Sequence, residues 1–287
     1  MTLYKTKVCC VIGDPIEHTL SPLIHNKAFE NLGLDFVYVA FRVNREMLGK
    51  AIDGIRAFNI HGINITIPHK VRVLEYLDVV NDLVRNIGAV NTIVNEEGRL
   101  IGYNTDGDGA LRALVKGGVS LSGKKVVVLG AGGAARAIVY FVAKEKPSSI
   151  MILNRTREKA DELAENVSTK TDLLARAKKL ENQSLKDEMP DADLVINCTS
   201  VGMAPNIGET PLPKSLLRKD IVVMDIIYNP LETRLLKEAK EAGAITISGV
   251  EMFVHQAASA FEIWTGNKAP VDLMKQITIE ALEGELK

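Results

Sequence analysis

A glycine-rich turn between an apolar run and a helical pattern constrains the fold of this chain more than any other feature. The turn follows the strand-like run 125–129 and reads Gly130-Ala131-Gly132-Gly133-Ala134-Ala135. At this spacing Gly130 permits a tight bend, Gly132 lets the backbone approach a pyrophosphate, and the small Ala135 lets the helix pack on the strand. The helix N-terminus then offers N–H groups and partial positive charge to phosphates. The pattern predicts a dinucleotide-binding α/β domain.

The end of the next expected strand indicates which dinucleotide this turn binds. An Asp or Glu about 20 residues after the glycines would hold the ribose hydroxyls of NAD. Here the strand 150–153 is followed by Asn154-Arg155-Thr156, which contains no acid. The Arg155 guanidinium can contact a 2′-phosphate with two parallel hydrogen bonds, and Thr156 and Lys159 can add donors. The sequence therefore favours NADP as the dinucleotide. The alternative interpretation is that Arg155 is only a solvated arginine at the end of a strand.

Runs rich in Val and Ile alternate with helical patterns in the N-terminal part of the chain. The expected strands and helices are 7–12 with 22–32, 36–43 with 46–58, and 63–67 with 69–77. This alternation is typical of βαβ units with a mainly parallel sheet. A β-hairpin is expected at 90–95 and 99–103, around Glu96-Glu97-Gly98, and it would give the sheet a mixed edge.

A second alternation predicts a second α/β lobe. Its expected elements are strand 125–129, a helix to about residue 145, strand 150–153, helix 158–166, and strands 194–197 and 221–225. The charged stretch 170–186 is expected to be a solvated helix or loop. The seam between the lobes is expected near residues 106–123, where a helical pattern ends at Gly117-Gly118.

The charge balance and the cysteines exclude several classes of protein. The 287 residues include 35 Lys and Arg and 36 Asp and Glu, so no general basic field draws the chain to nucleic acid or an anionic membrane. Cys9, Cys10 and Cys198 lack the spacing of a zinc site and favour a reducing compartment. The long apolar stretch 126–143 contains glycines and Arg136, which indicates a buried strand and helix rather than a membrane span. We expect a cytoplasmic protein without a metal.

Three polar clusters of the first lobe lie where a strand gives way to a turn or helix. They are His18-Thr19-Leu20-Ser21-Pro22, Asn64-Ile65-Thr66-Ile67-Pro68-His69-Lys70, and Asn91-Thr92 followed by Asn104-Thr105-Asp106. We expect them to converge at the carboxyl edge of one sheet, where their hydroxyls, amides, ammonium and carboxylate suit a polyhydroxylated small acid. Ser21 is as well suited to capping a helix that begins with Pro22 as to ligand contact.

Short motifs in a fixed order extend over nearly the whole chain. They are HTLSP, GINITIPHK, GAVNT, GYNTDGDG, GAGGAARA, NRT, NCTSVGM, DIIYNP and SGVEMFVHQAASAFEIWTG. Together these motifs resemble the shikimate dehydrogenase family. The resemblance implies reversible, NADP-dependent reduction of 3-dehydroshikimate to shikimate in aromatic amino-acid biosynthesis. It also implies a substrate-binding and catalytic domain over residues 1–108, a Rossmann-like NADP-binding domain over 109–246, and C-terminal helices over 247–287 that return to the substrate domain.

The same motifs imply roles for single residues. Lys70 and Asp106 resemble the catalytic pair, with Lys70 donating the proton in reduction, in a cleft between the two lobes. Asp106 either orients Lys70 and the substrate hydroxyl or shares the proton with Lys70. Substrate contacts are implied for Thr19, Ser21, Asn64, Thr66, Asn91, Tyr228 and Gln256. Cofactor contacts are implied for Gly130, Ala131, Gly132, Gly133, Ala134, Asn154, Arg155, Thr156, Lys159, Thr199, Gly249 and Met252.

One departure from the family pattern leaves alternatives open. The family usually has Ser-x-Ser before the proline, whereas this chain has Thr19-Leu20-Ser21. The extra methyl of Thr19 narrows the expected carboxylate pocket, so the balance between shikimate and quinate stays open. A quinate or dual dehydrogenase is therefore one rival, and a catalytically silent cofactor-binding regulator is another. The sequence does not decide the oligomeric state, and a homodimer is one possibility.

Overall fold

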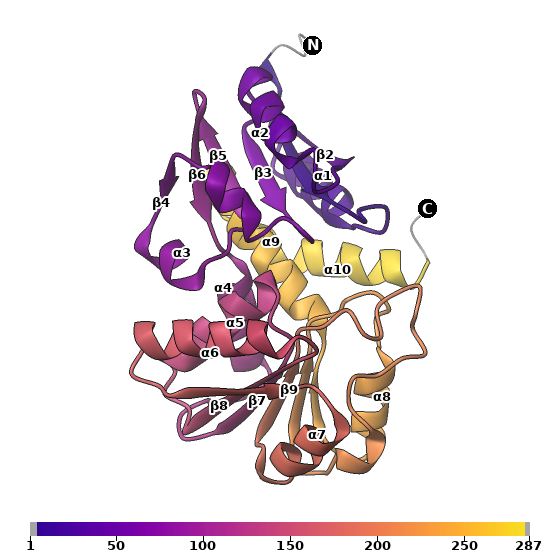
Figure 1. Ribbon diagram of the computed structural model, residues 1–287. Coiled ribbons are helices and arrows are strands. Elements are labelled where there is room, and N and C mark those ends of the chain that lie inside the picture. Colours follow the sequence, from indigo (N-terminus) through magenta and orange to yellow (C-terminus); the bar gives the residue numbers. More distant parts are fainter. Residues whose placement is uncertain (1–4, 285–287) are drawn as a thin grey trace. The chain divides into compact units, whose positions relative to one another are not determined.

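The computed structural model describes residues 5–284, which form two compact α/β units (Figure 1). Unit 1 contains the described residues up to Thr105 and those from Gln256 onward, and unit 2 is Asp106–His255. Each unit is built on one six-stranded sheet, which confirms the predicted α/β class. The functional boundaries expected after residues 108 and 246 stay predictions.

The sheet of unit 1 has the strand order β2-β1-β3-β5-β6-β4. Its strands are β1 (Lys7–Gly13), β2 (Phe36–Arg42), β3 (Gly62–Ile65), β4 (Val79–Val80), β5 (Thr92–Glu96) and β6 (Arg99–Tyr103). β1 pairs in parallel with both β2 and β3, whereas β5 runs antiparallel to both β3 and β6. The β5–β6 pair confirms the expected hairpin. The carboxyl ends of β1 and β3 thus meet the start of β5 at one edge.

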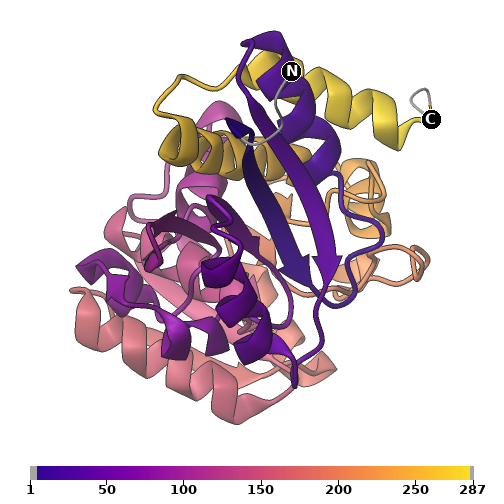
Figure 2. The same cartoon turned by 90° about the horizontal axis from the view of Figure 1, so that it is seen from above.

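Helices pack on this sheet from both ends of the chain. They are α1 (Ser21–Asn31), α2 (Leu48–Ala57), α3 (Asp82–Ile87), α9 from Gln256 onward (whole helix Gly249–Thr265) and α10 (Val271–Leu282). α10 packs against α1, and Figures 1 and 2 show the yellow C-terminal helix beside the indigo N-terminal one. Trp264 on α9 donates its indole N–H to Ile93 O on β5 at 3.0 Å, which ties the last helices to the sheet.

Two local expectations for unit 1 are wrong. Ser21 is the first residue of α1 rather than its cap, because the Thr19 hydroxyl accepts from the Ser21 N–H and Leu20 occupies the cap position. The helix expected at 69–77 is only a 3₁₀ helix, Arg72–Tyr76. There the backbone of Lys70 accepts from Val90 N at 2.7 Å, a tertiary bond that replaces a helical one.

Unit 2 is a doubly wound sheet in which every pair of neighbouring strands is parallel, with the order β12-β11-β10-β7-β8-β9. Its strands are β7 (Lys125–Leu129), β8 (Ser149–Asn154), β9 (Ala175–Lys179), β10 (Leu194–Asn197), β11 (Val222–Asp225) and β12 (Ile245–Ile247). Its helices are α4 (Asp106–Lys116), α5 (Gly133–Lys144), α6 (Arg157–Lys170), α7 (Asn182–Glu188), α8 (Arg234–Glu241) and the first part of α9. This strand order is that of a Rossmann fold.

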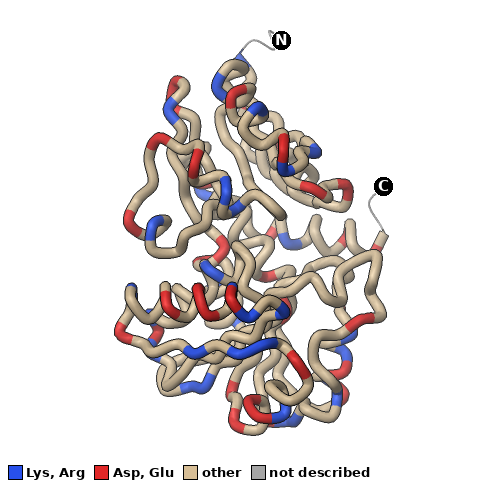
Figure 3. The backbone as a smooth tube through the Cα atoms, in the orientation of Figure 1, with Lys and Arg blue, Asp and Glu red and all other residues tan. Residues whose placement is uncertain are grey.

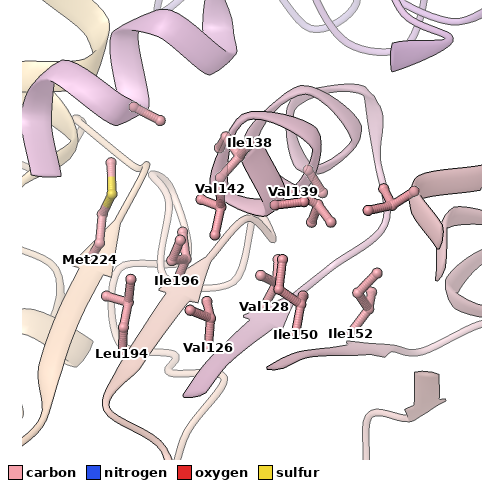
Figure 4. Close-up of a cluster of buried hydrophobic side chains, with 14 of the residues drawn as sticks. Val126, Val128, Ile138, Val139, Val142, Ile150, Ile152, Leu194, Ile196 and Met224 are labelled. Atoms are coloured by element: carbon pink, nitrogen blue, oxygen red, sulfur yellow. The ribbon is translucent and has the colours of Figure 1, made fainter. Parts of the chain in front are cut away.

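The central strands of this sheet are buried on both faces. On one face, alternate residues of β7, β8 and β10 pack beneath Ile138, Val139 and Val142 of α5 (Figure 4). The intervening residues, such as Val127 and Leu129 on β7, belong to a separate cluster. Burial on both faces explains why central strands such as β7 and β10 are nearly continuous apolar runs.

The solvated helix or loop expected at 170–186 is wrong for residues 175–179. Residues Ala175–Lys179 form β9, the edge strand that pairs with β8, and α7 follows from Asn182. Ala175 is buried, while the later positions of the strand carry Lys178 and Lys179, a charged pattern that suits an exposed sheet edge. Pairing with β8 therefore decides the conformation of this stretch.

Lys and Arg residues are interspersed with Asp and Glu residues along the backbone of each unit (Figure 3). Examples are the pairs Lys27–Glu30 at 2.8 Å in unit 1 and Lys178–Glu188 at 2.7 Å in unit 2. Within residues 5–284, no helix has both the length and the apolarity that crossing a membrane requires.

Candidate active site

The loops that follow β1 and β3 are held together at one edge of the unit 1 sheet. Thr66 N donates to Ile12 O at 3.0 Å, and Asp14 N donates to Ile67 O at 2.8 Å. A Cβ on Gly13 would lie 2.3 Å from Thr66 Cγ2, so this close approach requires glycine. Thr66 is thereby fixed beside the end of β1.

Two hydroxyl groups lie together on the loop that leaves β1. Thr19 Oγ1 is 3.2 Å from Ser21 Oγ and also accepts from Ser21 N at 3.3 Å. Ser21 is buried and Thr19 is half-buried. Both hydroxyls can rotate, so the pair can offer donors to a carboxylate. The structure thus brings these two expected substrate contacts together.

Three expected substrate contacts are joined by a buried hydrogen-bond network in unit 1. Asn64 Nδ2 donates to Asn91 O at 3.1 Å, and Asn91 Nδ2 is 3.5 Å from Gln256 Oε1. The Asn91 amide also binds Thr105 at both ends, through Nδ2 to the hydroxyl at 2.9 Å and through Oδ1 from the backbone N–H at 2.8 Å. The network therefore fixes the residue that directly precedes Asp106.

Lys70 lies in a tightly held segment after β3, and it is half-buried. The preceding His69 is 1% exposed, and its Nε2 is 2.7 Å from Val43 O. Since a carbonyl only accepts, this ring nitrogen carries the proton. On the other side, Val90 N donates to Lys70 O at 2.7 Å. The backbone of Lys70 is thus anchored from two directions.

Asp106 is the first residue of α4 and is 3% exposed. It belongs to unit 2, whereas Lys70 belongs to unit 1. Their joint action is therefore a prediction from the motifs.

The glycine-rich turn of unit 2 has the geometry expected from its spacing. Gly130 has φ +108°, and a Cβ there would lie 3.0 Å from Cys198 O, so glycine is required at this bend. Gly132 caps α5, and a Cβ on it would meet nothing within 4 Å. Ala135 is fully buried where α5 packs on the sheet. The open face at Gly132 and the first N–H groups of α5 suit a pyrophosphate.

The end of β8 presents the residues expected to bind a 2′-phosphate. Arg155, Thr156 and Lys159 are exposed, and Asn154 Nδ2 donates to Thr156 O at 2.8 Å, which orders the loop. Arg155 forms no hydrogen bond or ion pair with the described residues, so its guanidinium is available to a ligand.

A buried polar network, which the sequence did not reveal, joins the ends of β10 and β11. Asn197 Nδ2 donates to Asp225 Oδ1 at 3.0 Å, and Asn197 Oδ1 accepts from the Thr199 hydroxyl at 2.7 Å and from its backbone N–H at 3.0 Å. Ile227 N also donates to Asp225 at 3.1 Å. Burial raises the pKa of Asp225 to about 6. The network shapes the loops that carry Thr199 and Tyr228.

The start of α9 packs against the loop after β11 within unit 2. A Cβ on Gly249 would lie 2.4 Å from Ile227 O, so this contact requires glycine. Tyr228 stacks on Phe253 with ring centroids 4.1 Å apart. Met252 is buried in the apolar core beneath. Gly249 and Met252 thus have structural roles here, and their cofactor contacts stay predictions.

Comparison with known proteins decides the family. Residues 11–93 match the shikimate dehydrogenase substrate binding domain, residues 113–230 match shikimate / quinate 5-dehydrogenase, and residues 249–277 match the shikimate 5′-dehydrogenase C-terminal domain. A protein named shikimate dehydrogenase (NADP(+)) from Bacillus cereus strain B4264 is 49% identical over 276 residues, which cover 96% of this chain and 98% of that protein. The chain belongs to the shikimate dehydrogenase family.

Solved structures of shikimate dehydrogenases share the fold over nearly the whole chain. One, in complex with NADP⁺, is 46% identical with a TM-score of 0.90 and covers 97% of this chain and 96% of its own. Another, from Listeria monocytogenes in complex with shikimate and NAD, is 42% identical with a TM-score of 0.86 and covers 95% of this chain and 96% of its own. The resemblance drawn from the motifs is confirmed.

The expected site residues of this shikimate dehydrogenase family member carry hydroxyls, amides, cationic side chains and the carboxylate of Asp106. Among residues 5–284, no group of three or more His, Cys, Asp or Glu is arranged to hold a metal ion. The cysteine beside the glycine turn, Cys198, has its pKa raised by burial and by the carboxylates of Asp225 and Asp106, which disfavours a reactive thiolate.

Proposed function

We propose that this protein is an NADP-dependent shikimate dehydrogenase that interconverts 3-dehydroshikimate and shikimate in aromatic amino-acid biosynthesis. The observation that carries the proposal is the network of Asn64, Asn91 and Gln256, in a chain 49% identical to a protein of that name. Together with Thr19, Ser21 and Thr66, these residues offer hydroxyls and amides to a ligand rich in hydroxyl groups. Tyr228 completes the proposed substrate contacts.

The proposed cofactor is NADP, which when bound supplies or accepts a hydride. Three features of unit 2 support it: the open face at Gly132, the bend at Gly130, and an exposed Arg155 with no acid beside it. We propose further contacts by residues of the same turn, the strand ends and α9, namely Ala131, Gly133, Ala134, Asn154, Thr156, Lys159, Thr199, Gly249 and Met252.

Proton transfer is assigned to Lys70. In reduction its ammonium donates a proton to the C3 carbonyl oxygen, which becomes the hydroxyl of shikimate, and in oxidation Lys70 takes the proton back. The bonds from Val90 and His69 hold the backbone at this position, so the side chain starts from a fixed point. Asp106 acts on the same proton, either by orienting Lys70 and the hydroxyl or by sharing the proton.

Steady-state kinetics test the proposal directly. Purified protein is assayed with shikimate and with quinate, each with NADP⁺ and with NAD⁺, by the absorbance of the reduced cofactor. We expect the highest kcat/KM for shikimate with NADP⁺. A preference for quinate would favour the quinate alternative, which the methyl of Thr19 leaves open. NADP⁺ binding without turnover of either acid would instead favour a regulator.

The variant Lys70→Ala tests the assigned chemistry. We expect kcat to fall by roughly 10²-fold to 10⁴-fold, the usual scale for a lost proton donor. Lys50→Ala, which removes an exposed lysine of α2 in the same unit, is the control and should keep its activity. A loss below about tenfold in Lys70→Ala would remove Lys70 from proton transfer.

Compartment and assembly complete the proposal. Cys9, Cys10 and Cys198 are all free thiols in this structure, which agrees with a reducing cytoplasm. We propose a cytoplasmic enzyme and take the homodimer as the assembly to be tested. Sedimentation equilibrium distinguishes a dimer from the 31.3 kDa monomer.

A further inference from the structure

We propose that Tyr38 is a positioning residue, which holds the Asn64 amide so that this side chain presents a hydrogen-bond acceptor to the substrate. The inference rests on the proposed function in one respect only, the assignment of Asn64 as a substrate contact. Tyr38 itself lies on β2, outside every motif that pointed to the site.

The strand register places Tyr38 and Asn64 on the same face of the sheet. Tyr38 on β2 pairs with Cys9 on β1, and Cys9 pairs with Gly62 on β3, two residues before Asn64. Because side chains alternate along a strand, Gly62 and Asn64 point to the same face as Tyr38. The tyrosine thus reaches across β1, and its hydroxyl is 2.6 Å from Asn64 Oδ1.

Tyr38 is itself rigidly held. Its side chain is 1% exposed, and the His25 ring stacks on it with centroids 4.5 Å apart and planes 7° apart. The Asn26 amide binds the Tyr38 backbone at both ends, with Nδ2 donating to the carbonyl at 2.9 Å and Oδ1 accepting from the N–H at 2.8 Å. These contacts therefore hold the Tyr38 hydroxyl in a fixed position beside Asn64 Oδ1.

The hydrogen-bond partners of Asn64 determine the orientation of its side-chain amide. Asn64 Nδ2 lies 3.1 Å from Asn91 O and 3.2 Å from Thr92 Oγ1. A backbone carbonyl only accepts hydrogen bonds, so the amide nitrogen must face Asn91 O and the amide oxygen must face Tyr38. Tyr38 is consequently the donor in its bond to Asn64.

In this arrangement Asn64 can still accept a hydrogen bond. Both hydrogens of Nδ2 are used by Asn91 and Thr92, while Oδ1 has accepted one bond and has a second lone pair. Asn64 can therefore accept a hydrogen bond from a substrate hydroxyl and cannot donate one without breaking the network. Removing the Tyr38 hydroxyl leaves a buried oxygen without its donor and loosens the amide.

The variant Tyr38→Phe removes this hydroxyl and little else. We expect KM for shikimate to rise by about threefold to tenfold, the scale of one hydrogen bond, while KM for NADP⁺ stays unchanged. Tyr76→Phe is the matched control, because the Tyr76 hydroxyl makes no hydrogen bond with the described residues of the chain. An unchanged KM for shikimate in Tyr38→Phe would overturn the proposal.

A double-mutant cycle distinguishes positioning from packing. If Tyr38 acts through Asn64, adding Tyr38→Phe to Asn64→Ala should change kcat/KM by less than about twofold. An equal loss in both backgrounds would show that Tyr38 only supports the fold, and would overturn the proposal. Asn64→Ser replaces the alanine variant if the latter does not fold.

A spectroscopic measurement keeps the inference separate from the proposed activity. The side-chain amide signals of Asn64, assigned in a ¹⁵N–¹H spectrum by their loss in the Asn64 variant, should shift in Tyr38→Phe and stay in place in Tyr76→Phe. If wild-type protein does not turn over shikimate, the proposed function fails, and this spectrum alone decides the inference. Unshifted Asn64 signals in Tyr38→Phe would overturn it.

Discussion

Asp225 at the end of β11 accepts a hydrogen bond of 2.7 Å from the Thr233 hydroxyl, which caps α8. Thr233 Oγ1 in turn accepts from Leu236 N at 3.3 Å, so one hydroxyl joins a strand end to a helix start. Asp225 is fully buried, and its carboxylate also receives donors from Asn197 and Ile227. A single buried carboxylate thereby holds the loops that follow β10 and β11, which carry the proposed cofactor contact Thr199 and the proposed substrate contact Tyr228.

The pKa of Asp225 leads to a prediction about stability and pH. Burial raises this pKa from 3.8 to about 6, so between these values the folded protein binds more protons than the unfolded chain. The free energy of unfolding contributed by this group therefore falls as pH rises through that window. Asp225→Asn has no charge to bury, so its stability relative to wild type should improve by up to about 3 kcal/mol from pH 4 to pH 7. Urea unfolding at both pH values measures this difference.

Asp193→Asn is the control for that measurement. The Lys125 backbone N–H lowers the pKa of Asp193, so its contribution has the opposite sign and is lost as pH falls. Asp193→Asn should therefore lose relative stability as pH rises. Parallel pH dependence in the two variants would contradict the assignment to Asp225.

Two glycines of the turn should respond differently to alanine. Gly130→Ala places a Cβ 3.0 Å from Cys198 O at φ +108°, so we expect a loss of about 1–3 kcal/mol in unfolding free energy. Gly132→Ala adds a methyl into open space at φ −81°, so stability should change by less than about 1 kcal/mol. If the pyrophosphate binds at this open face, as proposed, the added methyl obstructs it and the Kd for NADP⁺ should rise at least about tenfold. Urea unfolding and NADP⁺ titration of both variants test this contrast.

Features that lie within one short segment of the chain could be predicted from the sequence. The turn from Gly130 to Ala135 has its strand, bend and helix within one short segment, so spacing alone predicted its geometry. The stretch containing β9 is different, because its charged composition matches a solvated helix and only pairing with β8 makes it a strand. Local pattern could not show that partner.

The supporting residues of the site were missed for the same reason. Tyr38 binds Asn64 from 26 residues away, and His69 binds Val43 from the same separation. Asp225 meets Asn197 across 28 residues. The motifs implied a substrate contact for Asn64 and proton transfer for Lys70. The residues that hold these two positions could be identified only from the register of the strands and the tertiary contacts.

Arg155 supports a prediction about cofactor preference. Its guanidinium is exposed and unengaged by the described residues, so Arg155→Ala should leave the unfolding free energy nearly unchanged. If Arg155 binds the 2′-phosphate, KM for NADP⁺ should rise by roughly 10-fold to 150-fold, while KM for NAD⁺ should hardly change. Arg157→Ala, which removes the ion pair with Asp161 at 3.3 Å, is the neighbouring control and should alter neither KM. An equal rise for both cofactors in Arg155→Ala would indicate a general effect on the binding domain.

His69 supports a prediction about proton transfer. Its buried Nε2 holds Val43 O at 2.7 Å and so anchors the backbone next to Lys70. His69→Ala should lower kcat by a few-fold to about tenfold, the scale of one lost positioning hydrogen bond, and should also lower stability. Val73→Ala removes a fully buried side chain of the same segment and keeps the bond to Val43, so it should lower stability while kcat changes less than about twofold. Thermal unfolding and kcat are measured on both variants, and an equal fall in kcat at equal loss of stability would assign His69 to packing alone.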